Sequence, residues 1–158
     1  MAVDMFLKIE GIDGVSPEQS IEISSFSWGV SNPGSASAGG GGGGASSRAV
    51  FQDLSVTKRI DKSSPLLYLT CASGEHIRKA TLTVARCASN ADGTASSTSL
   101  EYKLTDCIIS ATKPSGGSSD PSPAEEVSFN FAKIEWTYKA ADGSAVRTGW
   151  DLKKNTKA

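Results

Sequence analysis

The sequence has almost no excess charge of either sign and no long hydrophobic run. Its 158 residues include 16 Lys or Arg and 17 Asp or Glu, for a formal net charge of −1. A protein that binds nucleic acid or an anionic membrane surface through bulk charge carries a basic excess, so we expect neither kind of partner. The apolar runs are far shorter than the roughly 20 residues that span a bilayer as a helix, so we expect no membrane insertion.

Residue types that carry catalysis or bind metals are also scarce. The one histidine is His76, and the three cysteines, Cys71, Cys87 and Cys107, form no C-x-x-C pair. Because three is an odd number, they cannot all pair within one chain. We predict three small buried side chains in a reducing compartment, with one disulfide plus a free thiol as the alternative. No spacing is typical of a metal site, so we predict no metal and no cofactor.

The sequence motifs of common enzymes are absent or uninformative. Six glycines, Gly39 to Gly44, formally satisfy G-x-G-x-x-G, but they open no helical pattern and lie outside any βαβ unit. No lysine follows them, as a P-loop requires, and neither G-x-S-x-G nor H-E-x-x-H occurs. Glu125 and Glu126 are neighbours in a predicted strand, so they point to opposite faces and are predicted to be solvated. We therefore predict that the protein is not an enzyme.

The sequence does have polar–apolar alternation of period two, which is typical of half-buried strands. The alternating segments begin near Val3, Ile21, Val50, Ala80, Leu100, Val127 and Val146. A change of parity near Ser24–Ser25 and another near Ala132–Lys133 each predict a bulge. Seven or eight such strands predict a mainly β protein, either an antiparallel barrel or a two-sheet sandwich. The length favours one domain over residues 1–158.

One short helix is predicted at about residues 65–73. Ser64 is a suitable N-cap, Pro65 suits the first helical position, and Gly74 suits the residue just past the end. The apolar stripe of this helix is predicted to comprise Leu66, Leu67, Leu69 and Cys71. His76 follows the helix, where an imidazole commonly caps backbone carbonyls. A hydrolase that uses His76 with a loop serine stays open as an alternative.

Several segments, in order and over about residues 4–155, resemble one known family. They are residues 5–14 (MFLKIEGIDG), 25–29 (SFSWG), 52–58 (QDLSVTK), 61–65 (DKSSP), 71–77 (CASGEHI), 127–136 (VSFNFAKIEW) and 149–152 (GWDL). On these residues the chain resembles the haemolysin-coregulated protein (Hcp) family, the tube protein of type VI secretion systems. Cys87 has no expected counterpart in that family, and the Gly39 to Gly44 run and the Lys113 to Pro123 loop look like its variable parts.

The resemblance implies an antiparallel two-sheet β-barrel with a single flanking helix. It implies homohexameric rings with an open channel that stack into a tube inside a contractile sheath and leave the cell with a spike protein. It further implies that small effector proteins ride in the lumen, with the ring as their chaperone. The expected location is the bacterial cytoplasm during assembly and then the exterior, with no cleaved signal peptide, because the N-terminus lacks the pattern of one. Since the chain stops at Ala158, we expect no fused effector domain.

Three groups of residues are candidates for these roles. The mixed-sign set proposed for ring stacking is Asp53, Lys58, Arg59, Asp61 and Lys62. The candidate anchors of the subunit interface, which equally suit a core, are Trp28, Trp136 and Trp150. The candidate lumen residues are Thr81, Thr83, Glu101, Lys103 and Thr105. We expect that reversing Lys58 and Lys62 to Glu leaves hexamers intact and weakens tubes.

Two alternatives to a tube subunit stay open. One is the hydrolase, which replacement of His76 by Ala would inactivate. The other is a monomeric ligand-binding β-barrel, which would sediment or scatter light as a species of 16.4 kDa.

Overall fold

The computed structural model describes residues 2–12, 14, 20–33, 48–89, 91, 93 and 95–158. The elements, in chain order, are β1 (Ala2–Ile9), β2 (Ile21–Glu22), β3 (Ser25–Ser27), β4 (Val30–Ser31), β5 (Val50–Phe51), β6 (Leu54–Arg59), α1 (Ser64–Ser73), β7 (Ile77–Ser89), β8 (Ala95–Ser115), β9 (Ala124–Lys139), β10 (Ala145–Asp151) and β11 (Thr156–Lys157). The prediction of a mainly β protein with one short helix is confirmed. The Gly39 to Gly44 run lies outside the described residues.

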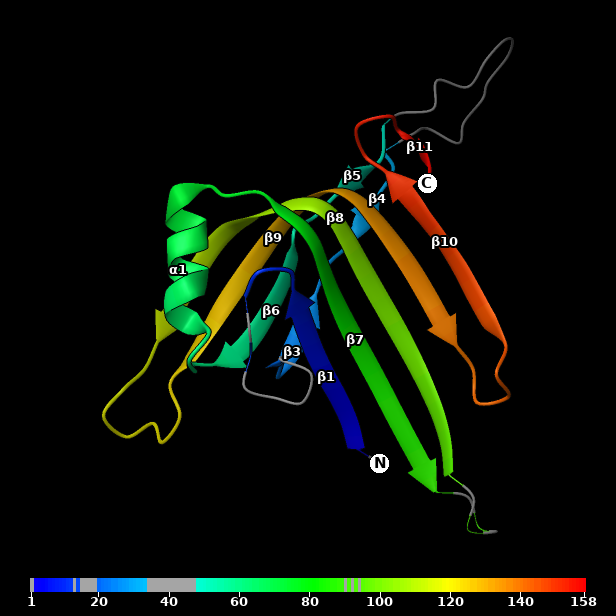
Figure 1. Ribbon diagram of the computed structural model, residues 1–158, viewed down its shortest axis with the longest axis horizontal. Coiled ribbons are helices and arrows are strands. Elements are labelled where there is room, and N and C mark those ends of the chain that lie inside the picture. The colour runs from blue at the N-terminus through cyan, green and yellow to red at the C-terminus, as the bar shows by residue number, and fades with distance from the viewer. Residues whose placement is uncertain are drawn as a thin grey trace.

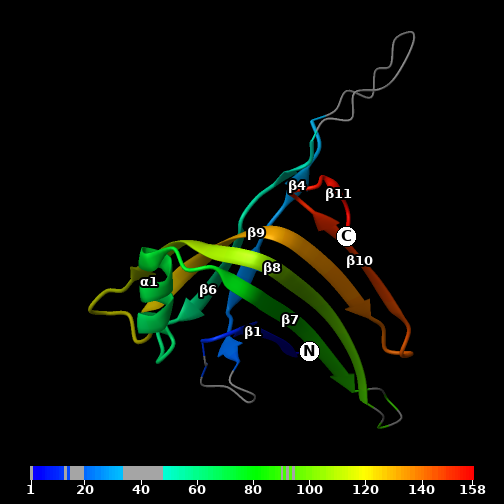
Figure 2. The ribbon, with the colours of Figure 1, turned by 45° about the horizontal axis from the view of Figure 1, so that its top comes forward.

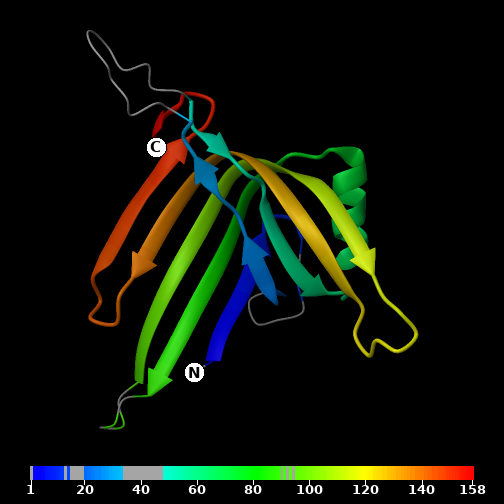
Figure 3. The same ribbon diagram turned by 180° about the vertical axis from the view of Figure 1, so that it is seen from behind.

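Most strands belong to one curved antiparallel sheet with the order β11-β10-β9-β8-β7-β1-β2 (Figure 1). β9 is long enough to pair with β6 along its first half and with β10 along its second half. From behind, β3 and β6 lie in front of β7 and β8 (Figure 3), so buried side chains of β6 and β7 can meet in one core. β4 and β5 form a second, two-stranded sheet that rises out of the body (Figure 2).

The barrel part of the fold prediction is not confirmed, because the ladders between the described strands do not close. The interruption lies in the segment that carries β2 and β3. β2 pairs with β1 and β3 pairs with β6, and the chain changes partner where Ile23 donates to the Met5 carbonyl and Ser24 to the Thr57 carbonyl. This is the place where the parity change predicts a bulge, and its cause is the exchange of one neighbouring strand for another.

The irregularity predicted at Ala132–Lys133 takes a different form. β8 and β9 keep one register from Tyr102↔Trp136 to Ile109↔Phe129, so no residue is inserted near Ala132. Both strands instead change their core-facing parity together, where Asp106 adopts a φ of 52°. The register shift lies between Ile109 and Ala111 of β8. The predicted bulge was therefore wrong in both strand and position.

The helix ends where its C-terminal signal predicts and begins one residue earlier than its N-terminal signal predicts. Gly74 adopts a φ of 67° and its N–H donates to the Cys71 carbonyl, which confirms the predicted C-terminus. The N-cap is Ser63 rather than Ser64, and its side chain makes no capping hydrogen bond. The predicted apolar stripe is only partly right, because Leu67 is buried whereas Leu66 and Leu69 are exposed.

The cysteines and loops also depart in part from expectation. All three cysteines are free, but only Cys107 is buried, Cys71 is half-buried and Cys87 is exposed. Burial, helped by the nearby charge of Asp106, raises the pKa of the Cys107 thiol to about 12. The predicted loop from Lys113 is shorter, since β8 continues to Ser115. Among the described helices, none has the length and hydrophobicity to cross a membrane.

Candidate functional surfaces

The five predicted lumen residues lie together on one face of the β7–β8 sheet. Thr81 pairs with Lys103 and Thr83 pairs with Glu101, while Thr105 pairs with Lys79. Directly paired residues on neighbouring antiparallel strands point to the same side of a sheet. The alternate residues of both strands, including Leu82 and Leu104, are buried in the core. The candidates therefore line the side of this sheet that faces away from the core, which we call the polar face.

The polar face continues across β9 and β10 through residues that the sequence analysis did not single out. Glu135 pairs with Lys103 in the sheet, and its carboxylate lies 3.7 Å from the Lys103 ammonium and 3.4 Å from the Arg147 guanidinium. A groove of about 230 Å³ is lined by Glu101, Lys103, Glu135, Thr137, Lys139 and Arg147. The groove mixes both signs of charge and presents no large apolar side chain. Alternation in β9 is the sequence signal that would have placed Glu135 and Thr137 on this face.

The predicted stacking residues do not form one surface. Asp53 precedes β6, where it accepts hydrogen bonds from Ser110 Oγ (2.6 Å) and Asn130 Nδ2 (3.0 Å). Arg59, Asp61 and Lys62 lie at the other end of β6. A strand rises about 3.3 Å per residue, so the length of β6 separates these three residues from Asp53. Arg59 and Lys62 are exposed, and Asp61 is half-buried.

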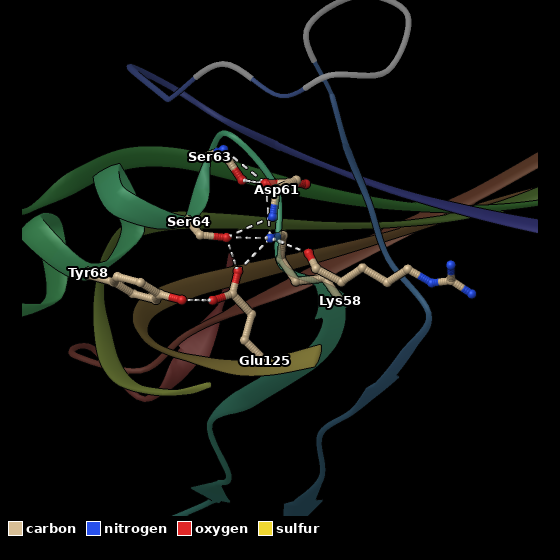
Figure 4. A network of polar contacts seen from close by, with 7 residues as sticks. Lys58, Asp61, Ser63, Ser64, Tyr68 and Glu125 are labelled. Carbon is tan, nitrogen blue, oxygen red and sulfur yellow. Dashed lines mark hydrogen bonds and ion pairs between the residues drawn. The ribbon is translucent and has the colours of Figure 1, made fainter. Parts of the chain in front are cut away.

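Lys58, the fifth of these residues, is buried rather than exposed. Its side chain has no accessible surface, and its ammonium lies 2.5 Å from Glu125 Oε1, whose side chain is equally buried (Figure 4). The ammonium also donates to the Arg59 carbonyl (2.8 Å), to Asp61 Oδ1 (3.1 Å) and to Ser64 Oγ (3.3 Å). A buried charge is tolerated only when it is paired and hydrogen-bonded, and both conditions are met here.

Glu125 completes this network from β9 and connects it to α1. Its Oε1 accepts a hydrogen bond from Ser64 Oγ (2.5 Å) and its Oε2 accepts one from Tyr68 Oη (2.6 Å). Burial alone raises the pKa of Glu125, but the hydrogen bonds from the ammonium and the two hydroxyls outweigh burial. The pKa of the carboxyl therefore lies below its ordinary value of 4.5. The prediction that Glu125 is solvated was wrong, whereas Glu126 is exposed as predicted.

The burial of Lys58 also changes the expected outcome of its charge reversal. A Glu at position 58 would place two carboxylates against each other inside the subunit. The variant would therefore destabilise the folded subunit itself, and it would not be a specific test of contacts between rings. A sequence signal for this burial exists, because Lys58 shares its parity with Leu54 and Val56, and Glu125 shares its parity with Val127 and Phe129.

The tryptophans pack within the subunit. The rings of Trp28 and Trp136 stack with centroids 5.7 Å apart, and Phe51 stacks against both at 6.4 and 6.5 Å. Trp150 is half-buried against the same core. Among the described residues, the buried indole Nε1 of Trp136 finds no hydrogen-bond partner. The core role left open for these residues thus has direct support, and their role at a subunit interface stays a prediction.

His76 does not cap the carbonyls of the helix. Its side chain is 73% exposed, and its Nδ1 lies 3.0 Å from Asp106 Oδ1, while Lys153 holds the other oxygen at 3.1 Å. The hydrogen bond with His76 and then that with Lys153 lower the pKa of Asp106. In the part of the chain that the structure describes, no serine bonds to His76, and no three potential ligands cluster as a metal site would require. A catalytic triad is therefore not assembled there.

Comparison with known proteins points to one family. A family model described as "Type VI secretion system effector, Hcp" matches residues 6–138. The chain is 36% identical over 166 aligned positions to Protein hcp1 of Pseudomonas aeruginosa, and the alignment covers all of both chains. Its fold is similar to the crystal structure of Hcp1 from Salmonella typhimurium, with a TM-score of 0.76, 32% identity and full coverage of both chains. It is also similar to the "Structure of a type six secretion system protein", with a TM-score of 0.80, 27% identity and coverage of 99% and 100%.

Proposed function

The chain belongs to the Hcp family of type VI secretion proteins, and we propose that it is the repeating subunit of the secretion tube. Hcp proteins are structural and secreted, not enzymes. In this proposal six copies close into a ring, rings stack into a tube, and the tube meets sheath and spike proteins of the secretion system. Small effector proteins travel in the lumen. The protein assembles in the bacterial cytoplasm and is then secreted.

The observation that carries the proposal is the polar face of the long curved sheet. A wall of a water-filled channel needs polar side chains on one side and a packed core on the other. β7, β8 and β9 provide both, with Thr81, Lys103 and Glu135 on the polar side. Mixed charges suit transport of varied cargo, because they hold water and offer no large apolar patch on which a passenger protein would remain bound.

Ring closure is favoured by a free sheet edge. β11 pairs only with Trp150 and Asp151 of β10, so the outer edge of residues 145–148 has no strand partner within the described part of the chain. Val146 on this edge is 70% exposed. An unpaired edge is a template for another chain, and a heterologous contact that closes after six copies makes a ring without open edges. Trp150, half-buried beside this edge, is the tryptophan best placed to anchor such a contact.

The mass of the purified protein tests the ring. Light scattering over a dilution series is expected to give about 98 kDa, six times the mass of one chain. A species of 16.4 kDa at every concentration would contradict the proposal and favour the monomeric ligand-binding alternative. Replacement of His76 by Ala is expected to leave the mass of the assembly and its secretion unchanged. The hydrolase alternative instead predicts that this replacement abolishes the activity of the protein.

Ring stacking is tested with the exposed charges near the end of β6. Reversing Arg59 and Lys62 to Glu is expected to leave hexamers intact and to shorten tubes in electron micrographs. Each exposed ion pair contributes only about 0–1 kcal/mol, but six copies repeat on every ring face. Lys154→Glu, an exposed reversal in another part of the molecule, is the matched control. Tubes of normal length from the double variant would count against this stacking surface.

A further inference from the structure

A pocket separate from the polar face lies where the loop after α1 meets β8, β9 and the turn between β10 and β11. Its volume is about 320 Å³, and none of its lining residues lines the groove of the polar face. The apolar part of the lining comes from Ile108, Phe131, Ala132 and Leu152. This size is at the lower end of the range for small-ligand sites.

The polar part of the lining is mainly basic. Arg48, His76 and Lys153 contribute to it, beside the neutral amide of Asn130 and a single carboxylate from Asp106. Both oxygens of Asp106 are already engaged, one by His76 and the other by Lys153. Arg48, Lys153 and Asp106 together have a formal net charge of +1, in a chain whose formal net charge is −1.

Arg48 is the group best suited to receive an anion. Its Nη2 donates one hydrogen bond, to the Leu152 carbonyl at 2.6 Å, and the described residues offer the guanidinium no other partner. A guanidinium has five N–H donors in a planar fork that matches a carboxylate. Lys153 likewise has donors left after its bond to Asp106, because an ammonium carries three.

We propose that this pocket binds a carboxylate carried on a short apolar stem. The apolar lining would hold the stem, and Arg48 and Lys153 would hold the carboxylate. Two sources offer this chemistry: a small free acid, and the C-terminal residue of a polypeptide that ends in an apolar side chain. The inference concerns the single subunit and does not depend on ring or tube formation.

Calorimetric titration with matched acids and amides tests the proposal. The probes are N-acetyl-leucine and N-acetyl-leucinamide, and a tetrapeptide that ends in leucine as either the acid or the amide. Each acid is expected to bind at least about tenfold more tightly than its amide, since only the acid carries the charge. Tighter binding of the peptide acid than of N-acetyl-leucine identifies a chain terminus as the source, and equal binding identifies a small acid. Equal affinity of acid and amide, or no binding of either, would overturn the proposal.

Variants at the pocket provide the second measurement. The double variant Arg48→Gln/Lys153→Gln is expected to lose at least about tenfold in affinity for the acid, whereas Lys154→Gln, the exposed neighbour outside the pocket, is expected to lose none. Asp106→Asn removes the one negative charge and keeps a residue type that tolerates positive φ, so it is expected to bind the acid more tightly. Thermal unfolding confirms that each variant is folded. Unchanged affinity in the folded double variant would refute the assignment.

Discussion

At the scale of single residues, the buried pair of Lys58 and Glu125 connects three elements. Lys58 comes from β6 and Glu125 from β9. The Lys58 ammonium donates a hydrogen bond to Ser64 Oγ at the start of α1, and Ser64 Oγ donates one to Glu125 Oε1. Removing one partner of a buried pair leaves an uncompensated charge, which costs far more than losing a surface pair. The network therefore ties the start of the helix to β6 and β9, although it contributes little net stability relative to an apolar core.

We predict that Glu125→Gln lowers the free energy of unfolding by about 3 kcal/mol, the low end of the range for a broken buried pair. The Lys58 ammonium loses its fully buried carboxylate at 2.5 Å and keeps only the half-buried one of Asp61 at 3.1 Å. Urea unfolding of the purified protein measures this free energy. Glu126→Gln, the exposed neighbour, is the matched control and is expected to change it by less than about 0.5 kcal/mol. Similar effects of the two substitutions would show that the buried pair does not hold the fold.

The lowered pKa of Glu125 also predicts the direction of the pH dependence. A carboxyl whose folded pKa is depressed stabilises the protein above its unfolded pKa, here about 4.5, and loses that contribution as the pH falls through the folded pKa. Asp61 shifts in the same direction: burial opposes the shift, and hydrogen bonds from Ser63 and Lys58 outweigh it. Stability is therefore expected to fall below about pH 4.5, and less steeply in Glu125→Gln. Parallel pH profiles of the two proteins, from urea unfolding at each pH, would contradict this assignment.

At the scale of elements, α1 shows what the sequence can and cannot predict. Local chemistry predicts its ends to within one residue, because Pro65 fixes φ in the first turn and Gly74, which has no Cβ, adopts the left-handed conformation that ends the helix. The face of the helix that is buried cannot be predicted from the sequence, because leucines occur on more than one side of it. Only packing against the rest of the molecule determines that Leu67 is the leucine that is buried. The same limit explains the irregularities of the sheet. The parity change near Ser24 can be located from sequence because it arises within one segment. The parity change in β9 cannot be interpreted in the same way, because it accompanies the positive φ of Asp106 on the neighbouring strand β8.

The two faces of α1 predict opposite results for two leucines. Leu67→Ala is expected to cost about 2–5 kcal/mol of unfolding free energy, because Leu67 is fully buried in the core. Leu69→Ala is expected to cost less than about 0.5 kcal/mol, because Leu69 is 63% exposed. Urea unfolding of both variants checks the pair. A large loss of monomer stability for Leu69→Ala would show that the helix packs through a different face.

The candidate site was predictable to the extent that alternation determines it. The parity of β7 and β8 places Thr81, Lys103 and Glu101 on one face, and the structure brings them together. The burial of Lys58 does not follow from residue type, because a lysine is usually exposed even where the alternation places it on the core-facing side. Its partner, Glu125, lies 67 residues away, and only the pairing of β6 with β9 brings the two together.

At the scale of the whole molecule, the central claim is that the polar face of β7, β8, β9 and β10 becomes the wall of a closed ring. An electron-microscopy reconstruction of the purified protein is the most direct test. We predict annular particles with sixfold symmetry in which Thr81, Lys103 and Glu135 face the central channel. Particles without a ring, or rings in which these residues face outward, would contradict the account.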